Sequence, residues 1–557
     1  MSLLKTQSLL TVIVLMWLTI LPKSVMANEK LRQTLERSDD NEPFIVREEA
    51  ILNIDLLQSF YQDSQFSFLW RTEQGSPNAM ARELVDTIAS IDDEGLLPND
   101  YHYALLLELN ALTEIERELV LSDAFVTLVS HLIAGKTDAQ QIKSEWKSLP
   151  KPRDASFQLL QLAATKSLTK VLADVRPVDA RYEKMKQALI SLRKMTKVEW
   201  LPLTASPVIK TIGASDPRIS DIATRLKLLN DLAPEWDNKV YDDELFAAVK
   251  RFQRRHGLKE DGVLGKESFT ALNITPADRV MALTVNLERF RWLDEKLGNK
   301  YVLVNIAGFY LRVIENNELM LDMPVIVGRE FRKTPVFSDK IRYLVLNPQW
   351  VVPTTLAVED KLPAIKADQN YLKNFGFSVY QGNSTAAVDP SDIDWKSLTK
   401  RNFNLRLVQA AGPLNALGQI KFMFPNEYDV YLHDTPAREL FEQTQRNFSS
   451  GCIRVSAPLL LAENLLAGTQ WDLDRIKLQL MTNETKTVHL KQAVPVHIEY
   501  WTAWADINGV MNFRADIYKR DALLYAAMQQ SLAQVTDEQS QLKRVNEQRY
   551  NPAHLDQ

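Results

Sequence analysis

The sequence contains very little cysteine, and Cys452 is the single thiol among 557 residues. A disulfide needs two cysteines, so no intramolecular disulfide can support the fold. A redox cycle that uses a second, resolving thiol is excluded for the same reason. The seven histidines are scattered and form no His-Glu-x-x-His sequence, so nothing indicates a zinc hydrolase site. We therefore expect neither a metal nor another cofactor.

The chain also lacks an excess of basic residues: 66 Lys and Arg stand against 71 Asp and Glu, a net charge of −5 at pH 7. Nucleic-acid binding needs a basic surface, so nucleic acid is not an expected partner. No low-complexity stretch or long internal repeat is evident. With 557 residues, 45% of them hydrophobic, the chain is too long for one core, and about three domains are expected.

One long apolar run lies near the N-terminus, at residues 9–21. It follows Lys5 and precedes Val25 and Ala27, which have the spacing that a signal peptidase reads. The run has about 13 residues, fewer than the roughly 20 that span a bilayer, although an uncleaved anchor would use the same segment. Residues 1–27 are expected to be a signal peptide or an N-terminal anchor, which places the rest of the chain outside the cytoplasm.

Residues 28–215 have the periodicity of helices. Runs such as 78–91 and 114–134 carry apolar residues at spacings of three and four, and β-rich segments are few. The pattern predicts an all-helical module.

A second, smaller helical unit is expected at residues 216–276. Leu245, Val249 and Phe252 lie on one face of a helix that ends at Gly257, and Phe252 is interpreted as a core residue. A helical connector at residues 277–299 follows.

After residue 300 the pattern changes to strands rich in Val, Ile, Tyr and Phe, which predicts a β-rich domain to residue 497. The expected strands are residues 301–314, 319–327, 343–352, 418–424 and 429–432. A partly helical insertion at about 354–403 interrupts them and could act as a lid. Residues 498–557 are expected to be a helical tail, so the fold class is multidomain α+β.

The frame around the single cysteine indicates reactivity. Cys452 lies in Ser449-Ser450-Gly451-Cys452-Ile453-Arg454, nineteen positions after His433. A cysteine attacks as thiolate, and a neighbouring histidine, a cation or a helix N-terminus must lower its pKa. The apolar stretch 458–466 predicts a helix just beyond Cys452 that could supply such a terminus. His433 is the predicted general base, and the N–H of Cys452 or Gly451 would hold an oxyanion, so acyl transfer is the expected reaction class.

Two further side chains near the cysteine are candidates for function. Arg454 follows the nucleophile by two positions, and its guanidinium suits binding of a substrate carboxylate or bracing of the loop. Tyr431 precedes His433 by two positions, so on a strand it shares a face with the base and could donate to an oxyanion.

Two resemblances to known families rest on these segments. The string from Ala247 to Asn273, with Phe252-Gln253, Gly257-Leu258, Asp261-Gly262 and Gly265, resembles the three-helix peptidoglycan-binding domain. The pattern of His433 followed by Ser449-Ser450-Gly451-Cys452-Ile453-Arg454 resembles the L,D-transpeptidase catalytic domain. The chain looks most like the large periplasmic branch of that family, which has a helical scaffold domain, a wall-binding domain and a lid; residues 328–335, 347–353 and 412–418 support this.

The resemblance implies a fold of β-sandwich type and a cysteine acyl-enzyme that joins peptidoglycan stem peptides by 3→3 cross-links in the periplasm. It also implies that the backbone carbonyl of Asp434 orients His433, that carbapenems acylate the thiol, and that the expected partners are stem peptides, glycan and other wall-synthesis proteins. Many family members have a histidine two positions before the cysteine, where this chain has Ser450, so the role of that side chain stays open. The residues expected at the substrate are Arg454, Ser449, Trp350 and Asn415.

The acceptor of the acyl group is not fixed by the sequence. Water would make the protein an L,D-carboxypeptidase, and a lipoprotein lysine would make it a wall-anchoring enzyme. A scaffold that binds peptidoglycan without catalysis is a further alternative, although the intact set of Cys452, His433 and Arg454 argues against it.

Overall fold

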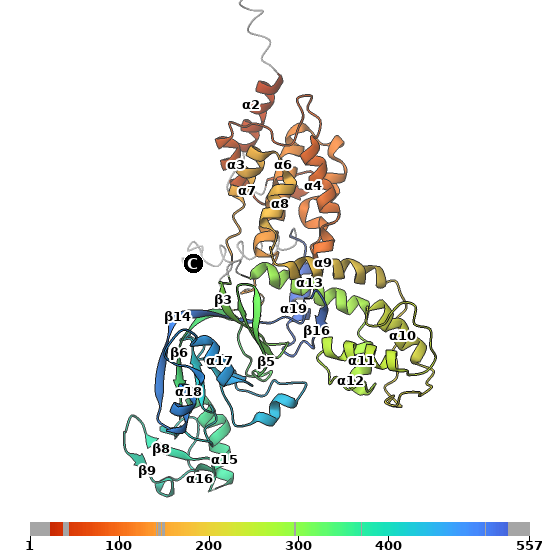
Figure 1. The fold of residues 1–557 in the computed structure, drawn as a ribbon. Coiled ribbons are helices and arrows are strands. Elements are labelled where there is room, and N and C mark those ends of the chain that lie inside the picture. Colours follow the sequence, from red (N-terminus) through yellow and green to blue (C-terminus); the bar gives the residue numbers. More distant parts are fainter. Residues whose placement is uncertain are drawn as a thin grey trace, which may run out of the picture.

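The computed structural model describes residues 23–36, 44–140, 142, 146, 151–293, 297–368, 370–506 and 508–532. Most of the expected signal or anchor segment, residues 1–22, lies outside these ranges. Among the helices that are described, none combines the length and the apolar character needed to cross a membrane. The predicted multidomain α+β class is confirmed: helical units come first and a β-rich unit follows (Figure 1).

The N-terminal unit is a bundle of helices around α6 (Glu114–Ala134), which is buried along most of its length. A capping box at Thr113 and Glu116 starts α6, since each side chain bonds the other residue's backbone N–H. The short hairpin of β1 (Ile45–Val46) and β2 (Glu49–Ala50) is the exception to the all-helical expectation. The other helices are α2 (Lys23–Glu36), α3 (Ile54–Asp63), α4 (Ala79–Ala89), α5 (Tyr103–Leu107), α7 (Ser156–Thr165), α8 (Leu168–Val175) and, beyond the bundle, α9 (Ala180–Met195).

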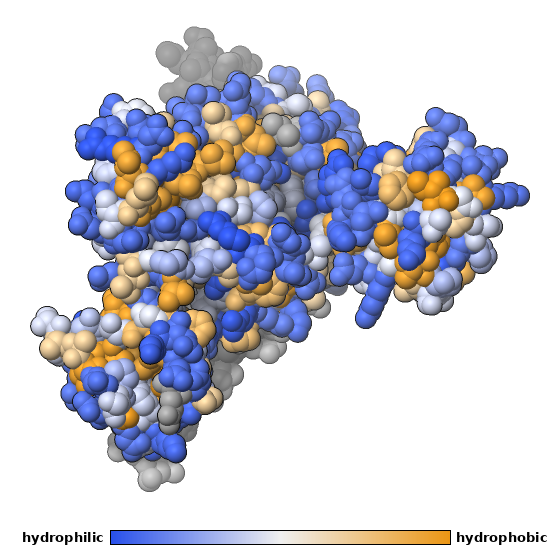
Figure 2. Space-filling view, turned by 60° about the horizontal axis from the view of Figure 1, so that its bottom comes forward, coloured by the Kyte–Doolittle hydropathy of each residue, from blue (hydrophilic) through white to orange (hydrophobic). Residues whose placement is uncertain are grey.

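The second unit packs α10 (Ile219–Leu228), α11 (Asp243–Arg255) and α12 (Lys266–Leu272) into a separate small core. Phe252 is fully buried in it, as interpreted from the sequence. This unit forms the lobe at the right of Figure 1. In Figure 2 the same lobe is separate from the rest of the molecule. The molecular surface in this view is largely hydrophilic and carries several apolar patches.

The predicted connector is α13 (Pro276–Trp292), and it is the centre of the molecule rather than an exposed link. Its polar side chains are buried against other units. Arg279 bonds His256 of the second unit at 2.8 Å. Glu288 accepts from Thr137 of the first unit at 2.7 Å, and Arg289 pairs with Asp521 near the C-terminus at 2.8 Å.

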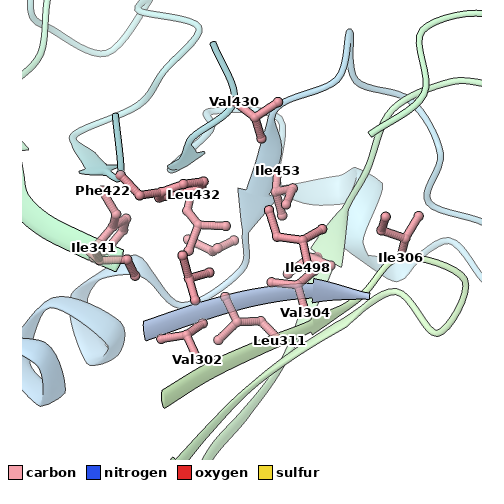
Figure 3. Packing of buried hydrophobic residues seen from close by; sticks show 14 of the residues in the cluster. Val302, Val304, Ile306, Leu311, Ile341, Phe422, Val430, Leu432, Ile453 and Ile498 are labelled. Atoms are coloured by element: carbon pink, nitrogen blue, oxygen red, sulfur yellow. The ribbon is translucent and has the colours of Figure 1, made fainter. Parts of the chain in front are cut away.

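The β-rich unit is a closed eight-stranded barrel in the order β11-β12-β13-β5-β4-β3-β14-β6. Closure into a barrel refines the sandwich-type arrangement that the resemblance implied. Apolar side chains from these strands meet inside it, with Val304, Phe422 and Leu432 among them (Figure 3). The strands are β3 (Lys300–Asn305), β4 (Tyr310–Glu315), β5 (Glu318–Ile326), β6 (Phe337–Leu346), β11 (Ile420–Met423), β12 (Leu432–His433), β13 (Ile453–Val455) and β14 (Lys486–Glu499).

Several predicted boundaries in this unit are wrong. The single strand expected at 301–314 is two strands, because the chain turns at residues 306–309 before β4 pairs back on β3. β14 continues to Glu499, beyond the predicted end at 497, since that residue still pairs with Asn305.

Two helices, α17 (Pro458–Leu465) and α18 (Leu473–Met481), share the apolar core of the barrel.

The insertion at 354–403 is part of a compact α/β unit with its own core. Its sheet has the order β7-β10-β8-β9, and short helices pack against that sheet. Tyr431 of the barrel packs against the same core. The elements are β7 (Trp350–Val351), α14 (Thr354–Leu356), the π-helical turn η4 (Ala357–Lys361), α15 (Leu362–Ala367), α16 (Tyr371–Asn374), β8 (Phe377–Gln381), β9 (Ala387–Val388) and β10 (Leu405–Gln409).

The expectation of a helical tail at 498–557 is wrong for its first part. The strands β15 (Ala503–Ala505) and β16 (Met511–Phe513) form an antiparallel hairpin, and only α19 (Asp521–Gln529) is helical in the described residues to 532. The hairpin strands are three residues long, too short for their alternation to stand out in the sequence. Both α19 and the hairpin contact α13 or neighbouring helices, so this segment is part of the core.

Candidate active site

Strand pairing brings the predicted nucleophile and base together. Cys452 directly precedes β13, which runs parallel to β12, and Arg454 pairs with His433 in this register. The N–H of Ile453 donates to the carbonyl of Tyr431 at 3.1 Å. The thiol, the imidazole and the guanidinium are therefore held at one edge of the barrel by backbone hydrogen bonds.

The loop before the cysteine is fixed by its own polar groups. The Ser449 hydroxyl donates to the carbonyl of Cys452 at 2.6 Å and accepts from the N–H of Gly451 at 3.2 Å. Thr334 donates to the carbonyl of Gly451 at 2.8 Å. Gly451 has a φ of +119°, a conformation that side chains with a Cβ rarely adopt. This geometry explains why a glycine stands before the nucleophile.

The helix expected at 458–466 is confirmed as α17, but it does not follow Cys452 directly. β13 follows the cysteine, and α17 begins only at Pro458. The prediction that a helix N-terminus lies against the thiol is therefore wrong, because the parallel pairing with β12 takes the chain into a strand first. The positive charges near the Cys452 sulfur therefore come from the side chains of Lys421 and Arg454.

Cys452 is a free, partly exposed cysteine whose S–H points to the carbonyl of Asp429, with a sulfur-to-oxygen distance of 3.6 Å. Burial raises the pKa of its thiol. Hydrogen bonds from the backbone and hydroxyl of Tyr431, and the positive charges of Lys421 and Arg454, act in the opposite direction.

His433 is buried, and its Nδ1 lies 2.5 Å from the backbone oxygen of Asp434. Burial, followed by the charge of Arg454, lowers the pKa of His433 to about 3. The imidazole is therefore neutral near pH 7. With the Nδ1 proton donated to the carbonyl of Asp434, Nε2 is left as the basic nitrogen.

The side chain of Asp434 holds the turn that contains this carbonyl. Its carboxylate accepts from the N–H groups of Gln419 at 2.8 Å and Thr435 at 2.7 Å, and it also pairs with Arg438. Gly418 lies directly against the carboxylate: a Cβ on Gly418 would be 2.4 Å from Asp434 Cγ. The turn after His433 thus depends on a glycine from the neighbouring loop.

Tyr431 lies between the base, the nucleophile and the insertion. Its ring centroid is 5.6 Å from that of His433, and its hydroxyl bonds Cys452. Burial, followed by the negative charge of Cys452, raises the pKa of the Tyr431 phenol, so the hydroxyl keeps its proton and can donate.

Two cations flank the histidine. Arg454 lies beside it on β13, and its Nε is buried and makes no hydrogen bond within the described part of the chain. Lys421 lies on its other side, since β11 pairs Lys421 with His433. The sequence analysis did not identify Lys421. The alternating pattern of β11 puts Lys421 on the face opposite the buried Ile420 and Phe422. Only the register of β11 with β12 shows that Lys421 lies opposite His433.

Ser450 connects the loop of the cysteine to the insertion. Its hydroxyl accepts from Arg332 at 3.2 Å, and the same guanidinium pairs with Asp360 at 2.6 Å and Glu359 at 2.8 Å. The position where the family pattern often has a histidine therefore takes part in a polar contact with the insertion.

Three residues expected at the substrate are buried and serve the framework instead. Ser449 is 3% exposed and bonds within its own loop. Asn415 is 1% exposed and donates to the carbonyls of Pro348 and Ala410, both at 2.9 Å. Trp350 is 8% exposed in the core of the insertion. Of the four residues expected at the substrate, Arg454 is the one that is partly exposed near the thiol.

No group of three or more His, Cys, Asp or Glu side chains in the described ranges is arranged to hold a metal ion.

Comparison with known families gives three matches along the chain. Residues 299–478 match the L,D-transpeptidase catalytic domain, residues 215–272 match a domain described as "Putative peptidoglycan binding domain", and residues 55–189 match the scaffold domain. The catalytic match contains His433, Cys452 and Arg454.

Individual relatives cover parts of the chain. A Haemophilus influenzae protein described as "Putative L,D-transpeptidase" is 34% identical over 294 residues, which are 52% of this chain and 58% of that protein. The alignment thus spans somewhat more than half of that relative's length.

Two solved structures of L,D-transpeptidases are also similar in part. The one from Stackebrandtia nassauensis is 15% identical, with 52% of this chain and 94% of that chain covered and a TM-score of 0.21. The one from Mycobacterium smegmatis is 13% identical, with 36% and 58% covered and a TM-score of 0.18. From the family matches, the chain contains an L,D-transpeptidase catalytic domain, preceded by a scaffold domain and a peptidoglycan binding domain.

Proposed function

We propose that this protein is an L,D-transpeptidase that forms 3→3 cross-links between peptidoglycan stem peptides through an acyl-enzyme on Cys452. The observation that carries the proposal is the parallel pairing of β12 with β13, the strand that begins directly after Cys452, within a matched catalytic domain. The peptidoglycan binding match supports the same class of substrate.

In the acylation step, His433 Nε2 takes the thiol proton while Cys452 Sγ attacks the carbonyl of the third residue of a tetrapeptide stem. The tetrahedral oxyanion collapses to a thioester, and the fourth, D-configured residue leaves as an amine that receives the proton from His433. Asp434 acts through its backbone carbonyl, which accepts from His433 Nδ1 and leaves Nε2 to act as the base.

The oxyanion needs hydrogen-bond donors that are not already engaged. The N–H of Gly451 donates to Ser449, so the N–H of Cys452 is the better of the two predicted backbone donors. The Tyr431 hydroxyl bonds Cys452 and retains its proton, which makes it a second donor close to the reacting carbonyl.

In the second step, the side-chain amine of a diamino acid on a neighbouring stem gives a proton to His433 and attacks the thioester. The new amide forms, and the thiol leaves with the proton returned by His433, so the enzyme is regenerated. Arg454 lies beside this centre with an unbonded, buried Nε, which suits a carboxylate of the stem peptide.

Domain arrangement and location follow from the same proposal. Residues 28–215 form the scaffold, residues 216–276 bind the wall, residues 277–299 connect these units to the barrel, and the barrel carries catalysis with the insertion at 354–403 as a lid. The protein acts in the periplasm, with residues 1–27 as signal or anchor, and carbapenems acylate the same thiol.

The test incubates the protein with disaccharide-tetrapeptide and follows both the products and the mass of the intact protein. Cross-linked dimer together with an acyl adduct that is lost in Cys452→Ala is the expected result. Tripeptide without dimer would show that water is the acceptor, and a lipoprotein lysine peptide added as acceptor tests wall anchoring. Absence of product and adduct would contradict catalysis and leave a peptidoglycan-binding scaffold.

A further inference from the structure

Lys421 has a position in the barrel that the proposed mechanism does not use. β11 pairs Lys421 with His433 of β12, and β12 pairs His433 with Arg454 of β13. Side chains of residues that pair directly across neighbouring strands lie on the same face of the sheet. Lys421, His433 and Arg454 therefore form a row across three strands at the site of Cys452.

The ammonium group of Lys421 is held by an aromatic ring. Its Nζ lies 3.8 Å from the centroid of Tyr431, within the range of a cation–π interaction. No carboxylate within the described ranges forms an ion pair with it, so its charge is not neutralised locally. Desolvation lowers the pKa of Lys421, and the negative charge of Cys452 raises it, which places the ammonium within the field of the sulfur.

The charges around the sulfur come from several elements. The cations are Lys421 on β11 and Arg454 on β13, and the charge of Arg329 acts on Arg454. His433 is neutral, and Tyr431 is a hydrogen-bond donor.

Other charged groups also act near this site. Asp429 acts on Lys421, Glu439 acts on Arg454, and Arg332 of the preceding loop is paired with Glu359 and Asp360. The helix α17 begins only at Pro458, after β13, so these side chains are the source of positive potential next to the sulfur.

We propose that Lys421 is an electrostatic positioning residue: its ammonium, seated on the ring of Tyr431, favours the thiolate of Cys452 and holds the Tyr431 hydroxyl toward the sulfur. The inference rests on the proposed function, because it assumes that Cys452 is the nucleophile. Lys421 acts through the field at the sulfur and through Tyr431, and it takes no proton in the reaction.

The experiment measures how the rate of Cys452 alkylation by iodoacetamide depends on pH. Cys452 is the only cysteine, so the mass of the intact protein reports this thiol alone. Lys421→Met is expected to raise the midpoint of the rate profile by about one pH unit, which is roughly tenfold less thiolate below the midpoint. Lys421→Arg keeps the charge and is expected to stay close to the unchanged protein.

Lys340→Met is the matched control, because it removes an exposed lysine from another barrel strand and is expected to leave the midpoint unchanged. Equal midpoints for Lys421→Met and the unchanged protein would overturn the inference. If Lys421→Met loses its native circular dichroism, Lys421→Gln is used in its place. A raised midpoint is again expected, and an unchanged midpoint would again overturn the inference.

Alkylation needs no stem peptide, so the two proposals can fail separately. A thiol that alkylates with the expected shift but takes no acyl group from tetrapeptide would contradict the proposed function alone. An acyl adduct together with an unshifted midpoint would contradict the role of Lys421 alone.

Discussion

Arg332 and Asp360 form a two-pronged ion pair, with Nη1 2.6 Å from Oδ2 and Nη2 2.9 Å from Oδ1. The same guanidinium reaches Ser450, two residues before the cysteine, at 3.2 Å. One side chain therefore joins the loop of the nucleophile to the π-helical turn of the insertion. Such planar, paired hydrogen bonds have more geometric specificity than a single contact between point charges.

Replacing Arg332 should loosen the insertion more than it unfolds the protein. Since Asp360 is partly exposed, the pair contributes about 1 kcal/mol, and Arg332→Met is expected to slow cross-linking roughly three- to tenfold. Limited proteolysis should cleave residues 354–403 faster. The control is Arg312→Met, which removes a comparable pair with Asp322 on the barrel. Unchanged kinetics and unchanged proteolysis would contradict the link.

Gly418→Ala tests the support of His433. The added Cβ would approach the Asp434 carboxylate to 2.4 Å, so the turn whose carbonyl holds the imidazole must move. Gly468→Ala is a matched control, since Gly468 also has a positive φ but nothing lies within 4 Å of its Cβ position. Both variants should lose about 1 kcal/mol of stability from backbone strain, and Gly418→Ala should lose more because of the contact with Asp434. Cross-linking should fall at least about tenfold in Gly418→Ala only; equal activities would argue against this dependence.

Glu499 makes stability depend on pH at the end of β14. Its carboxyl is buried, Oε2 has no hydrogen-bond partner in the described ranges, and burial raises the pKa of Glu499 to about 8 against a weaker effect of Arg181. The folded state thus binds the proton of the Glu499 carboxyl more tightly than the unfolded state. The stability that this protonated carboxyl contributes is therefore lost as pH rises from about 4.5 through 8.

Glu499→Gln should therefore flatten the fall of the melting temperature between pH 5 and pH 9. The comparison is made by thermal unfolding at several pH values, with the more exposed Glu315→Gln as control. Melting curves of Glu499→Gln that shift with pH in parallel with those of the unchanged protein would rule out this origin.

His102 should also make stability fall as pH rises, in the N-terminal unit and over a higher pH range. It bonds Glu49 at 2.6 Å and Asp123 at 2.7 Å; although burial lowers the pKa of His102, these two bonds outweigh it and bring the pKa to about 9. Its contribution is complete below pH 6.5 and is lost as pH rises through 9. His102→Gln is expected to cost about 1–3 kcal/mol at pH 6 and less above pH 9, measured by urea unfolding. His489→Gln is the control, and a cost independent of pH would refute the assignment.

Arg291 tests the central helix α13. It is fully buried, donates to the carbonyl of Glu94 at 3.1 Å and to Tyr182 at 3.0 Å, and pairs with Glu288. Arg291→Met would leave buried acceptors unpaired, so a loss of about 3–5 kcal/mol is expected in denaturant unfolding. Arg193→Met removes a half-exposed arginine and should cost about 1 kcal/mol or less. Similar losses in both variants would contradict the central role of α13.

The sequence predicted the classes of the units and the two residues of the proposed proton transfer, because both rest on local patterns. Periodicity is a property of neighbouring residues, and the frame of Cys452 lies within six positions. The contribution of Lys421 could not be predicted, since it depends on the pairing of β11 with β12, and a strand pattern does not contain its register.

Burial of polar side chains was the other feature that the sequence did not reveal. The sequence predicted α13 only as a helical connector, yet partners from distant segments cover its charged side chains Arg279, Glu288, Arg289 and Arg291. Ser449 and Asn415 are similar: their hydrogen bonds go to backbone groups of the framework, which the sequence pattern does not reveal.

The burial of α13 has a mechanical meaning. Arg279, Glu288 and Arg289 tie three different units to one helix, so a pull applied at the small lobe of α10 to α12 is carried through ion pairs and hydrogen bonds to the rest of the molecule. If that lobe grips a stretched polymer, tension in the polymer becomes a load on the barrel. The distance between the lobe and the barrel then limits how far from the point of attachment Cys452 can react.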